Sequence, residues 1–205
     1  MKPSQTLWSL GVDPGFGETG LVLRRSDHKD EVMAFATFQE HSTKLPGFVR
    51  ATALADAVCD KVNEWCSYFG ISRLEVCIEQ PIFNRNNRFS SVTTFLIQIR
   101  LYNSIETGLA MIVAPFLDEM HLTEAIPSST KKAATGDGSA DKGAIVKASP
   151  VDKSWDGLDT DGPLEAVADA WAHSLCAKTQ TINLTTTTMP VVMPHKEWKA
   201  KWSQS

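Results

Sequence analysis

The chain has 205 residues, of which 42% are hydrophobic and 21% charged, values typical of one globular domain with a sizeable core. No stretch is apolar for long enough to cross a bilayer, and the N-terminus lacks a signal-peptide pattern, so we expect no membrane association and a cytoplasmic location. The formal net charge of -4 argues against a surface that is basic throughout, although positive charge gathers locally in residues 85–88 and 131–153.

The cysteines and histidines do not follow the spacing of a zinc site. None of the 4 cysteines forms a CxxC pair, and none of the 5 histidines is paired with a cysteine or a second histidine at ligand spacing. We therefore expect reduced, mostly buried thiols. The cysteines are Cys59, Cys66, Cys77 and Cys176.

An apolar run at residues 7–12 predicts a buried strand that ends at Asp13. Pro14 and Gly15 then turn the chain into a second strand at residues 19–25. Asp-Pro-Gly is good turn chemistry in itself. A carboxylate between two apolar runs, however, is costly to ionise unless something pairs with it, so a functional role for Asp13 stays open beside the structural one.

The pattern from residue 31 to residue 79 predicts strand, helix and strand. Strands at 19–25 and 31–38 suggest an antiparallel meander, and residues 48–69 show helical spacing that ends at Gly70. Residues 73–79 form a strand that ends at Glu79. A crossover through the helix would place this strand parallel to the first, with Asp13 and Glu79 at the same end. The alternative is that Glu79 lies exposed on an edge strand.

The second half of the chain predicts a long helix and a late helix around a loop-rich region. The long helix covers residues 90–113, and its side with Phe95, Ile99 and Tyr102 is a candidate dimer surface. A short strand at 122–126, a Gly-rich basic loop at 128–142, a short helix at 140–148 and an acidic loop at 155–162 follow. The last helix begins at Pro163.

This last helix carries two acids on one face. Glu165 and Asp169 are four residues apart, and the alanines around them permit close packing against a sheet. Asp169 lies too far from the helix start to stabilise the helix dipole. Glu165 is either a capping-box residue, with Gly162 or Asp161 as N-cap, or a site residue. His173, one turn later, either supports the acids of the site or is a histidine with its hydrogen bonds satisfied elsewhere.

Carboxylates at the ends of two strands and on one helix would form an oxygen-rich pocket. Such ligands suit Mg²⁺ or Mn²⁺ rather than zinc. Two such ions can together promote phosphodiester hydrolysis.

Four motifs carry a resemblance to a known family. They are GVDPGFGETG at 11–20, CIEQP at 77–81, TGDGSADK at 135–142 and ADAWA at 168–172. In order and spacing, over roughly residues 7–176, the chain resembles RuvC-type Holliday junction resolvases of the ribonuclease H-like superfamily. The resemblance implies an α/β ribonuclease H-like fold, a five-stranded mixed sheet flanked by helices. Residues 1–178 would form the nuclease domain and residues 179–205 a C-terminal tail.

The resemblance also implies the roles of individual residues. Asp13, Glu79 and Asp169 become catalytic metal ligands. The family usually has an acid or histidine three residues before the last aspartate. Here that place is alanine, and Glu165 is its natural substitute as a catalytic metal ligand. Lys142 becomes the catalytic cation near the scissile phosphate.

DNA-binding residues follow from the same resemblance and from local basic charge. An aromatic residue expected three positions after the strand glutamate is Ile82 here, with Phe83 next. The expected DNA-binding residues are Phe83, Arg85, Arg88, Lys131, Lys132 and Lys142.

The function that the resemblance implies is a homodimeric endonuclease that makes paired nicks in four-way DNA junctions. It would use two Mg²⁺ or Mn²⁺ ions per active site and serve DNA recombination and repair in a bacterial or phage-infected cell. One alternative is a ribonuclease H that cuts RNA–DNA hybrids, and another is a junction-binding module without activity. An ATP-binding protein of the actin-like group would need a second domain and a second Gly-rich motif, which the sequence lacks.

Overall fold

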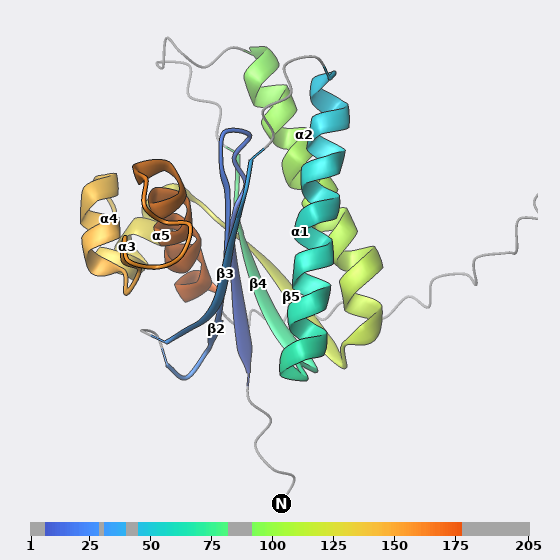
Figure 1. Cartoon of the computed structure of the whole chain (residues 1–205), viewed down its shortest axis with the longest axis horizontal. Helices are drawn as coiled ribbons and strands as arrows, with labels where there is room; N and C mark the ends of the chain where they lie inside the picture. The colour runs from blue at the N-terminus through green and yellow to red at the C-terminus, as the bar shows by residue number, and fades with distance from the viewer. Residues whose placement is uncertain (1–6, 29–30, 40–44, 82–91, 178–205) are drawn as a thin grey trace, which may run out of the picture.

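A five-stranded mixed sheet forms the centre of the protein (Figure 1). The structure, a computed structural model, describes residues 7–28, 31–39, 45–81 and 92–177. The strand order is β3-β2-β1-β4-β5. The strands are β1 (Trp8–Asp13), β2 (Thr19–Arg25), β3 (Val32–Phe38), β4 (Arg73–Glu79) and β5 (Glu119–Ala125). The expected five-stranded mixed sheet is thereby confirmed, while the expected tail and the loop with Phe83, Arg85 and Arg88 lie outside the described residues.

The pairing of β1 decides where the strand-end acids lie. β1 pairs antiparallel with β2 and parallel with β4, and β2 pairs antiparallel with β3. Val12 is the register partner of Ile78, so Asp13 and Glu79 follow at the same end of neighbouring strands. The predicted meander and the predicted parallel crossover are both confirmed.

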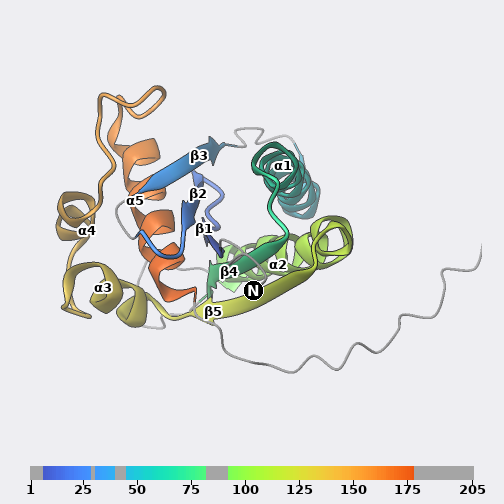
Figure 2. The ribbon, with the colours of Figure 1, turned by 90° about the horizontal axis from the view of Figure 1, so that it is seen from below.

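Helices cover both faces of the sheet, with α1 (Gly47–Phe69) and α2 (Val92–Gly108) on one face and α5 (Asp161–Cys176) on the other (Figures 1 and 2). Side chains alternate along the strands, so Leu10 and Val12 enter the core under α1 and α2. The intervening residues face α5, whose Val167 and Trp171 form a second core with Val22. Among the described residues, no helix has both the length and the apolar character of a bilayer span.

The region after β5 is more helical than the sequence suggests. β5 begins three residues before the predicted start, and α3 (Pro127–Thr135) occupies much of the expected loop at 128–142. Pro127 starts this helix and Gly136, at φ 85°, ends it in the left-handed conformation. The composition of residues 127–135 is typical of a loop, but Pro127 and Gly136 are ordinary start and stop residues of a helix. The predicted short helix is confirmed as α4 (Lys142–Ala148).

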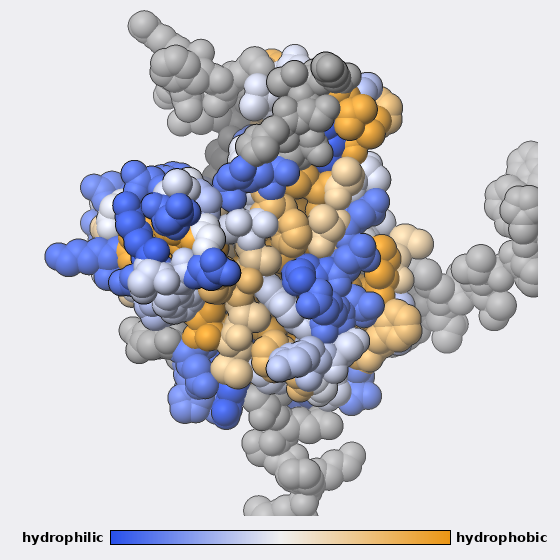
Figure 3. Space-filling model, in the orientation of Figure 1, coloured by the Kyte–Doolittle hydropathy of each residue, from blue (hydrophilic) through white to orange (hydrophobic). Residues whose placement is uncertain are grey.

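The prediction that Phe95, Ile99 and Tyr102 form an exposed dimer surface is wrong for Tyr102. Tyr102 is buried, and its hydroxyl donates a hydrogen bond of 2.5 Å to Oε1 of Glu124 on β5. The apolar side chains that α2 exposes are instead Val92 and Leu96. Figure 3 shows hydrophobic surface on the α1–α2 side of the molecule, which also exposes Phe48 of α1. The helix continues beyond α2 as a π-helical turn (Leu109–Val113) and a 3₁₀ turn (Ala114–Phe116).

Two glycines let α5 lie close to the sheet. A Cβ atom on Gly11 would overlap the carbonyl oxygen of Ala170, and one on Gly20 would overlap the carbonyl oxygen of Ala166. The backbone of the helix thus packs directly on β1 and β2, where any larger residue would push it away. The alanine-rich face that the sequence shows in this helix is confirmed as the packing face.

We predict that Gly11→Ala lowers the free energy of unfolding by about 2–3 kcal/mol, because the methyl group overlaps helix backbone that cannot move without displacing α5. Gly17→Ala is the control, since a Cβ there meets nothing within 4 Å, and it should stay within about 0.5 kcal/mol of wild type. Urea unfolding of the three proteins measures this difference. Equal stability of the two variants would contradict the close packing of α5.

Candidate active site

Asp13 and Glu79 reach the site from the ends of two neighbouring parallel strands. Both side chains are partly buried, and both point to the face of the sheet that α5 covers. The turn after Asp13 is closed by Thr19, whose hydroxyl donates a hydrogen bond of 2.7 Å to the carbonyl oxygen of Gly15. Because Thr19 is fully buried, this bond fixes the loop that carries the first acid.

Helix α5 supplies a row of three polar side chains, each one turn from the next. Glu165, Asp169 and His173 are spaced by four residues and therefore lie along one side of the helix. The N-cap is Thr160, which places Glu165 two residues beyond the position of a capping-box glutamate. The cap interpretation of Glu165 is therefore wrong, because the helix begins at Asp161, earlier than the sequence suggested.

Lys142 extends toward this row from the start of α4. The preceding residue, Asp141, is the N-cap, and its carboxylate accepts a hydrogen bond of 2.8 Å from the backbone N–H of Ala144. Nζ of Lys142 lies 3.1 Å from Oε2 of Glu165 and 3.8 Å from Oδ2 of Asp169. The ammonium group is thus the counter-charge of the two helix acids.

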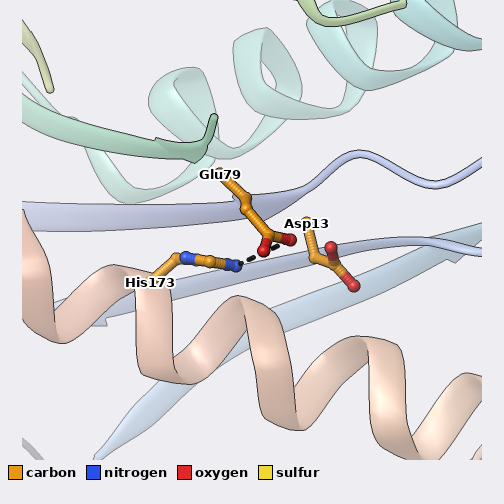
Figure 4. A group of neighbouring side chains, drawn as sticks. All are labelled: Asp13, Glu79 and His173. Carbon is orange, nitrogen blue, oxygen red and sulfur yellow. Dashed lines mark ion pairs between the residues drawn. The ribbon is translucent and has the colours of Figure 1, made fainter. Parts of the chain in front are cut away.

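His173 lies under the site with only 2% of its side chain exposed. Its Nε2 is 3.7 Å from Oε2 of Glu79, and its Nδ1 is 3.2 Å from Oγ1 of Thr130 on α3. Figure 4 shows the imidazole pointing from α5 toward Glu79, with Asp13 beside it. Of the two interpretations of His173, a role at the site agrees with this contact, and a histidine with all its hydrogen bonds satisfied elsewhere does not.

The negative charges change one another's ionisation. Burial, with the charges of Glu79 and Asp169, raises the pKa of Asp13 well above its usual range. Burial also raises the pKa of Asp169, although Lys142 and His173 oppose the shift. Burial acts on Glu79 in the same direction, but the contacts of Glu79 with the His173 ring and with the carboxyl group of Asp13 outweigh it and lower the pKa of Glu79.

These side chains surround one cavity of about 210 Å³. Its lining includes three of the four predicted acids, together with Lys131, Lys142, His173 and Thr130. Glu165 lies at the edge through its contact with Lys142. Lys132 is exposed on α3 and does not line the cavity.

The donor set suits a divalent cation. Asp13, Glu79 and His173 each offer one ligand atom, and these atoms lie within 4.8 Å of one another. Burial and the charges of Glu79 and Asp169 raise the pKa of Asp13, and a cation bound beside it would favour its ionised form. Hard carboxylate oxygens in such a cluster match Mg²⁺ or Mn²⁺, so the residues present fit the cations that the sequence suggested.

Comparison with solved structures gives matches to RuvC of Thermus thermophilus. The RuvC structure has a TM-score of 0.55 and 18% identity, covering 82% of this chain and 91% of that chain. T. thermophilus RuvC in complex with Holliday junction substrate has a TM-score of 0.58 and 19% identity, covering 82% of this chain and 90% of that chain. No family model and no curated protein matches the sequence. The likeness confirms the ribonuclease H-like fold that the sequence motifs suggested.

Two residues of the site, Thr130 and His173, were not among the candidate site residues that the sequence indicates. Thr130 was assigned to a loop, and recognition of Pro127 and Gly136 as helix ends would have placed it on a helix. The spacing of His173 from Asp169 showed that the two share a helix side. Nothing in the sequence indicated that Glu79 would meet this side, because that contact depends on how closely α5 packs.

We predict that Asp13→Asn stabilises the protein in metal-free buffer, and more so at about pH 8 than at about pH 4. Folding raises the pKa of Asp13 above the ordinary value of about 3.9, so the stability that its protonated form provides is lost as the pH rises through the raised pKa. Asparagine does not ionise, so the variant does not lose stability in this way as the pH rises. Each 1 kcal/mol regained raises the melting temperature by about 2–4 °C for a protein of this size.

Thermal unfolding at both pH values, with the exposed Asp156→Asn as control, measures this effect. Added Mg²⁺ should then stabilise wild type more than Asp13→Asn, since ligand binding to the folded state adds stability. A melting temperature for Asp13→Asn at or below wild type at pH 8 without metal would contradict the assigned repulsion.

Proposed function

We propose that this protein is a structure-selective DNA endonuclease that resolves four-way junctions, with residues 1–178 as its nuclease domain. The observation that carries the proposal is the arrangement of acids. Asp13 and Glu79 end adjacent parallel strands, Asp169 of α5 lines the same cavity, and Glu165 lies one helical turn away at its edge, in contact with Lys142. This is a carboxylate centre at the strand ends of a fold shared with RuvC of T. thermophilus.

The four acids are the proposed ligands of two Mg²⁺ or Mn²⁺ ions. Asp13 lies close to two of the other acids, and the charges of Glu79 and Asp169 both raise its pKa, after the larger effect of burial. Two bound ions supply compensation for charge at the reacting phosphate and a lower pKa for the attacking water. The protein holds the carboxylates on two strands and one helix, so their spacing is fixed before substrate arrives.

Lys142 is the proposed partner of the scissile phosphate. Its side chain is 64% exposed, and its described contacts to Glu165 and Asp169 are made by the terminal ammonium. A long, mobile side chain in this position can turn from the carboxylates to a phosphate oxygen in the same cavity. There its positive charge would stabilise negative charge that develops during hydrolysis.

Branched DNA is the proposed substrate. One of the similar structures is described as RuvC in complex with Holliday junction substrate, which supports this class of ligand. Lys131 lines the cavity and Lys132 is exposed on the same helix, so α3 would add phosphate contacts beside the acids. Phe83, Arg85 and Arg88 remain proposed DNA contacts on the basis of the sequence.

A homodimer is the proposed active form. A four-way junction has two-fold symmetry, and its resolution needs two strands cut at related positions, while one chain has one set of acids. The α1–α2 side exposes Phe48, Val92 and Leu96, and this apolar surface is our candidate for the contact between two copies.

We predict that the wild-type protein with Mg²⁺ or Mn²⁺ cleaves a four-way junction in preference to flap, linear duplex and RNA–DNA hybrid substrates. Asp13→Asn should bind the junction with nearly unchanged affinity but cleave it at least about 100-fold more slowly, because an amide carries no charge for cation binding. The assay uses strand-specific end labels, which also show whether nicks occur in pairs.

Two outcomes of this panel would contradict the proposal. Preferred cleavage of the hybrid would indicate a ribonuclease H, which shares the fold and the acids. Unchanged cleavage by Asp13→Asn would place the active site elsewhere. Nicks in one strand only, or a monomer on the junction by light scattering, would refute the paired-nick homodimer but leave the nuclease assignment in place.

A further inference from the structure

We propose that His173 is a nitrogen ligand of the cation between Asp13 and Glu79, and that Thr130 holds its ring in the ligating orientation. This inference rests on the metal centre of the proposed function and adds a donor to its four carboxylates. It also predicts which metal ion the centre prefers.

The geometry places the imidazole among the acids. Nε2 of His173 lies 3.7 Å from Oε2 of Glu79, and one donor atom from each of Asp13, Glu79 and His173 lies within 4.8 Å of the other two. Two donors on one ion lie at most about 4.4 Å apart when each ligand bond is about 2.0–2.2 Å long, so the three atoms need to approach one another by only a few tenths of an ångström to share an ion. Figure 4 shows His173 on α5 pointing toward Glu79, with the side chain of Asp13 next to Glu79.

The hydrogen bond of Nδ1 leaves Nε2 as the ring nitrogen that can bind a metal ion. The hydroxyl of Thr130 lies 3.3 Å from the carbonyl oxygen of Ile126 and 3.2 Å from Nδ1 of His173. A carbonyl only accepts, so the single hydroxyl proton of Thr130 goes to Ile126, and Nδ1–H must donate to the hydroxyl oxygen. With the proton on Nδ1, only Nε2 is left to act as a ligand, and a bound cation would take the place of the proton through which Nε2 contacts Glu79 in the metal-free protein.

The surroundings restrict this ring to the site. His173 is 2% exposed and lines the same cavity as Asp13 and Glu79. Thr130 is itself buried on α3, which packs against α5, so the Nδ1 contact is shielded from solvent. A buried imidazole fixed at one nitrogen cannot turn its other nitrogen toward water.

A nitrogen donor changes the expected preference for metal. Mg²⁺ takes oxygen ligands almost entirely, whereas imidazole suits transition metals. A site with two carboxylates and one imidazole should therefore bind Mn²⁺ more tightly than Mg²⁺. A site formed by carboxylates alone would discriminate less between the two ions.

The test is pulsed electron paramagnetic resonance of Mn²⁺ bound to the full-length, metal-depleted protein without DNA. Wild type should show the ¹⁴N modulation of a coordinated imidazole. His173→Gln should lose that signal and bind Mn²⁺ about 10–100-fold more weakly, with a smaller change for Mg²⁺. Thr130→Val should keep the nitrogen signal but weaken Mn²⁺ binding about tenfold.

His121→Gln is the matched control, because His121 lies on β5, where its Nε2 contacts Glu119. This variant should behave as wild type. Circular dichroism establishes folding, and if His173→Gln does not fold, the wild-type signal and the Thr130→Val affinity decide the question.

Bound Mn²⁺ without ¹⁴N modulation in wild type would overturn the inference, as would modulation that persists in His173→Gln. Junction cleavage by the same wild-type preparation distinguishes a failure of the His173 proposal from a failure of the proposed nuclease function. Cleavage without a nitrogen signal refutes only the role of His173. Absence of both divalent-cation binding and cleavage refutes the metal centre and this inference together.

Discussion

The direct contact between the backbone of α5 and the sheet determines the geometry of the site. Gly11 on β1 and Gly20 on β2 have no side chain, and the carbonyl oxygens of Ala170 and Ala166 occupy the space that a Cβ would need. At this separation, side chains on one side of the helix reach the ends of β1 and β4. With a larger residue between helix and sheet, the acids of α5 would lie too far from Asp13 to act with it.

This arrangement concentrates negative charge in a partly buried cavity, which opposes folding. The protein compensates in two ways: the ammonium of Lys142 contacts Glu165 and Asp169, and the imidazole of His173 contacts Glu79. The compensation is incomplete, since the pKa of Asp13 stays raised. A site that is unfavourable in the metal-free protein and relieved by a divalent cation is what a metal-dependent hydrolase requires, and functional sites often reduce stability for this reason.

Much of this architecture could be predicted from local sequence patterns. The apolar run before Asp13, the strand ending at Glu79 and the intervening helix were enough to place the two acids side by side, because a right-handed crossover leaves few alternatives. The acids of the last helix were found from their spacing of four residues. The repeated small residues of that helix also indicated its close packing.

What could not be predicted depends on contacts between elements distant in sequence. Thr130 meets His173 across 43 positions, and Tyr102 reaches Glu124 across 22. Both contacts arise only when helices are fixed on the sheet, so no local pattern reveals that His173 faces the site or that Tyr102 is buried. The helix α3 was missed for a different reason, because its polar composition resembles that of a loop although Pro127 and Gly136 mark its ends.

The central claim is that Asp169 on α5 and the strand-end acids form one metal-dependent active site. The most direct measurement compares cleavage of a four-way junction by Asp169→Asn and by Asp161→Asn, a change of the same chemistry at the exposed start of the same helix. We expect Asp161→Asn to cleave like wild type, whereas Asp169→Asn should bind the junction but not cleave it in Mg²⁺ or Mn²⁺. Cleavage at wild-type rate by Asp169→Asn would show that Asp169 is not part of the active site.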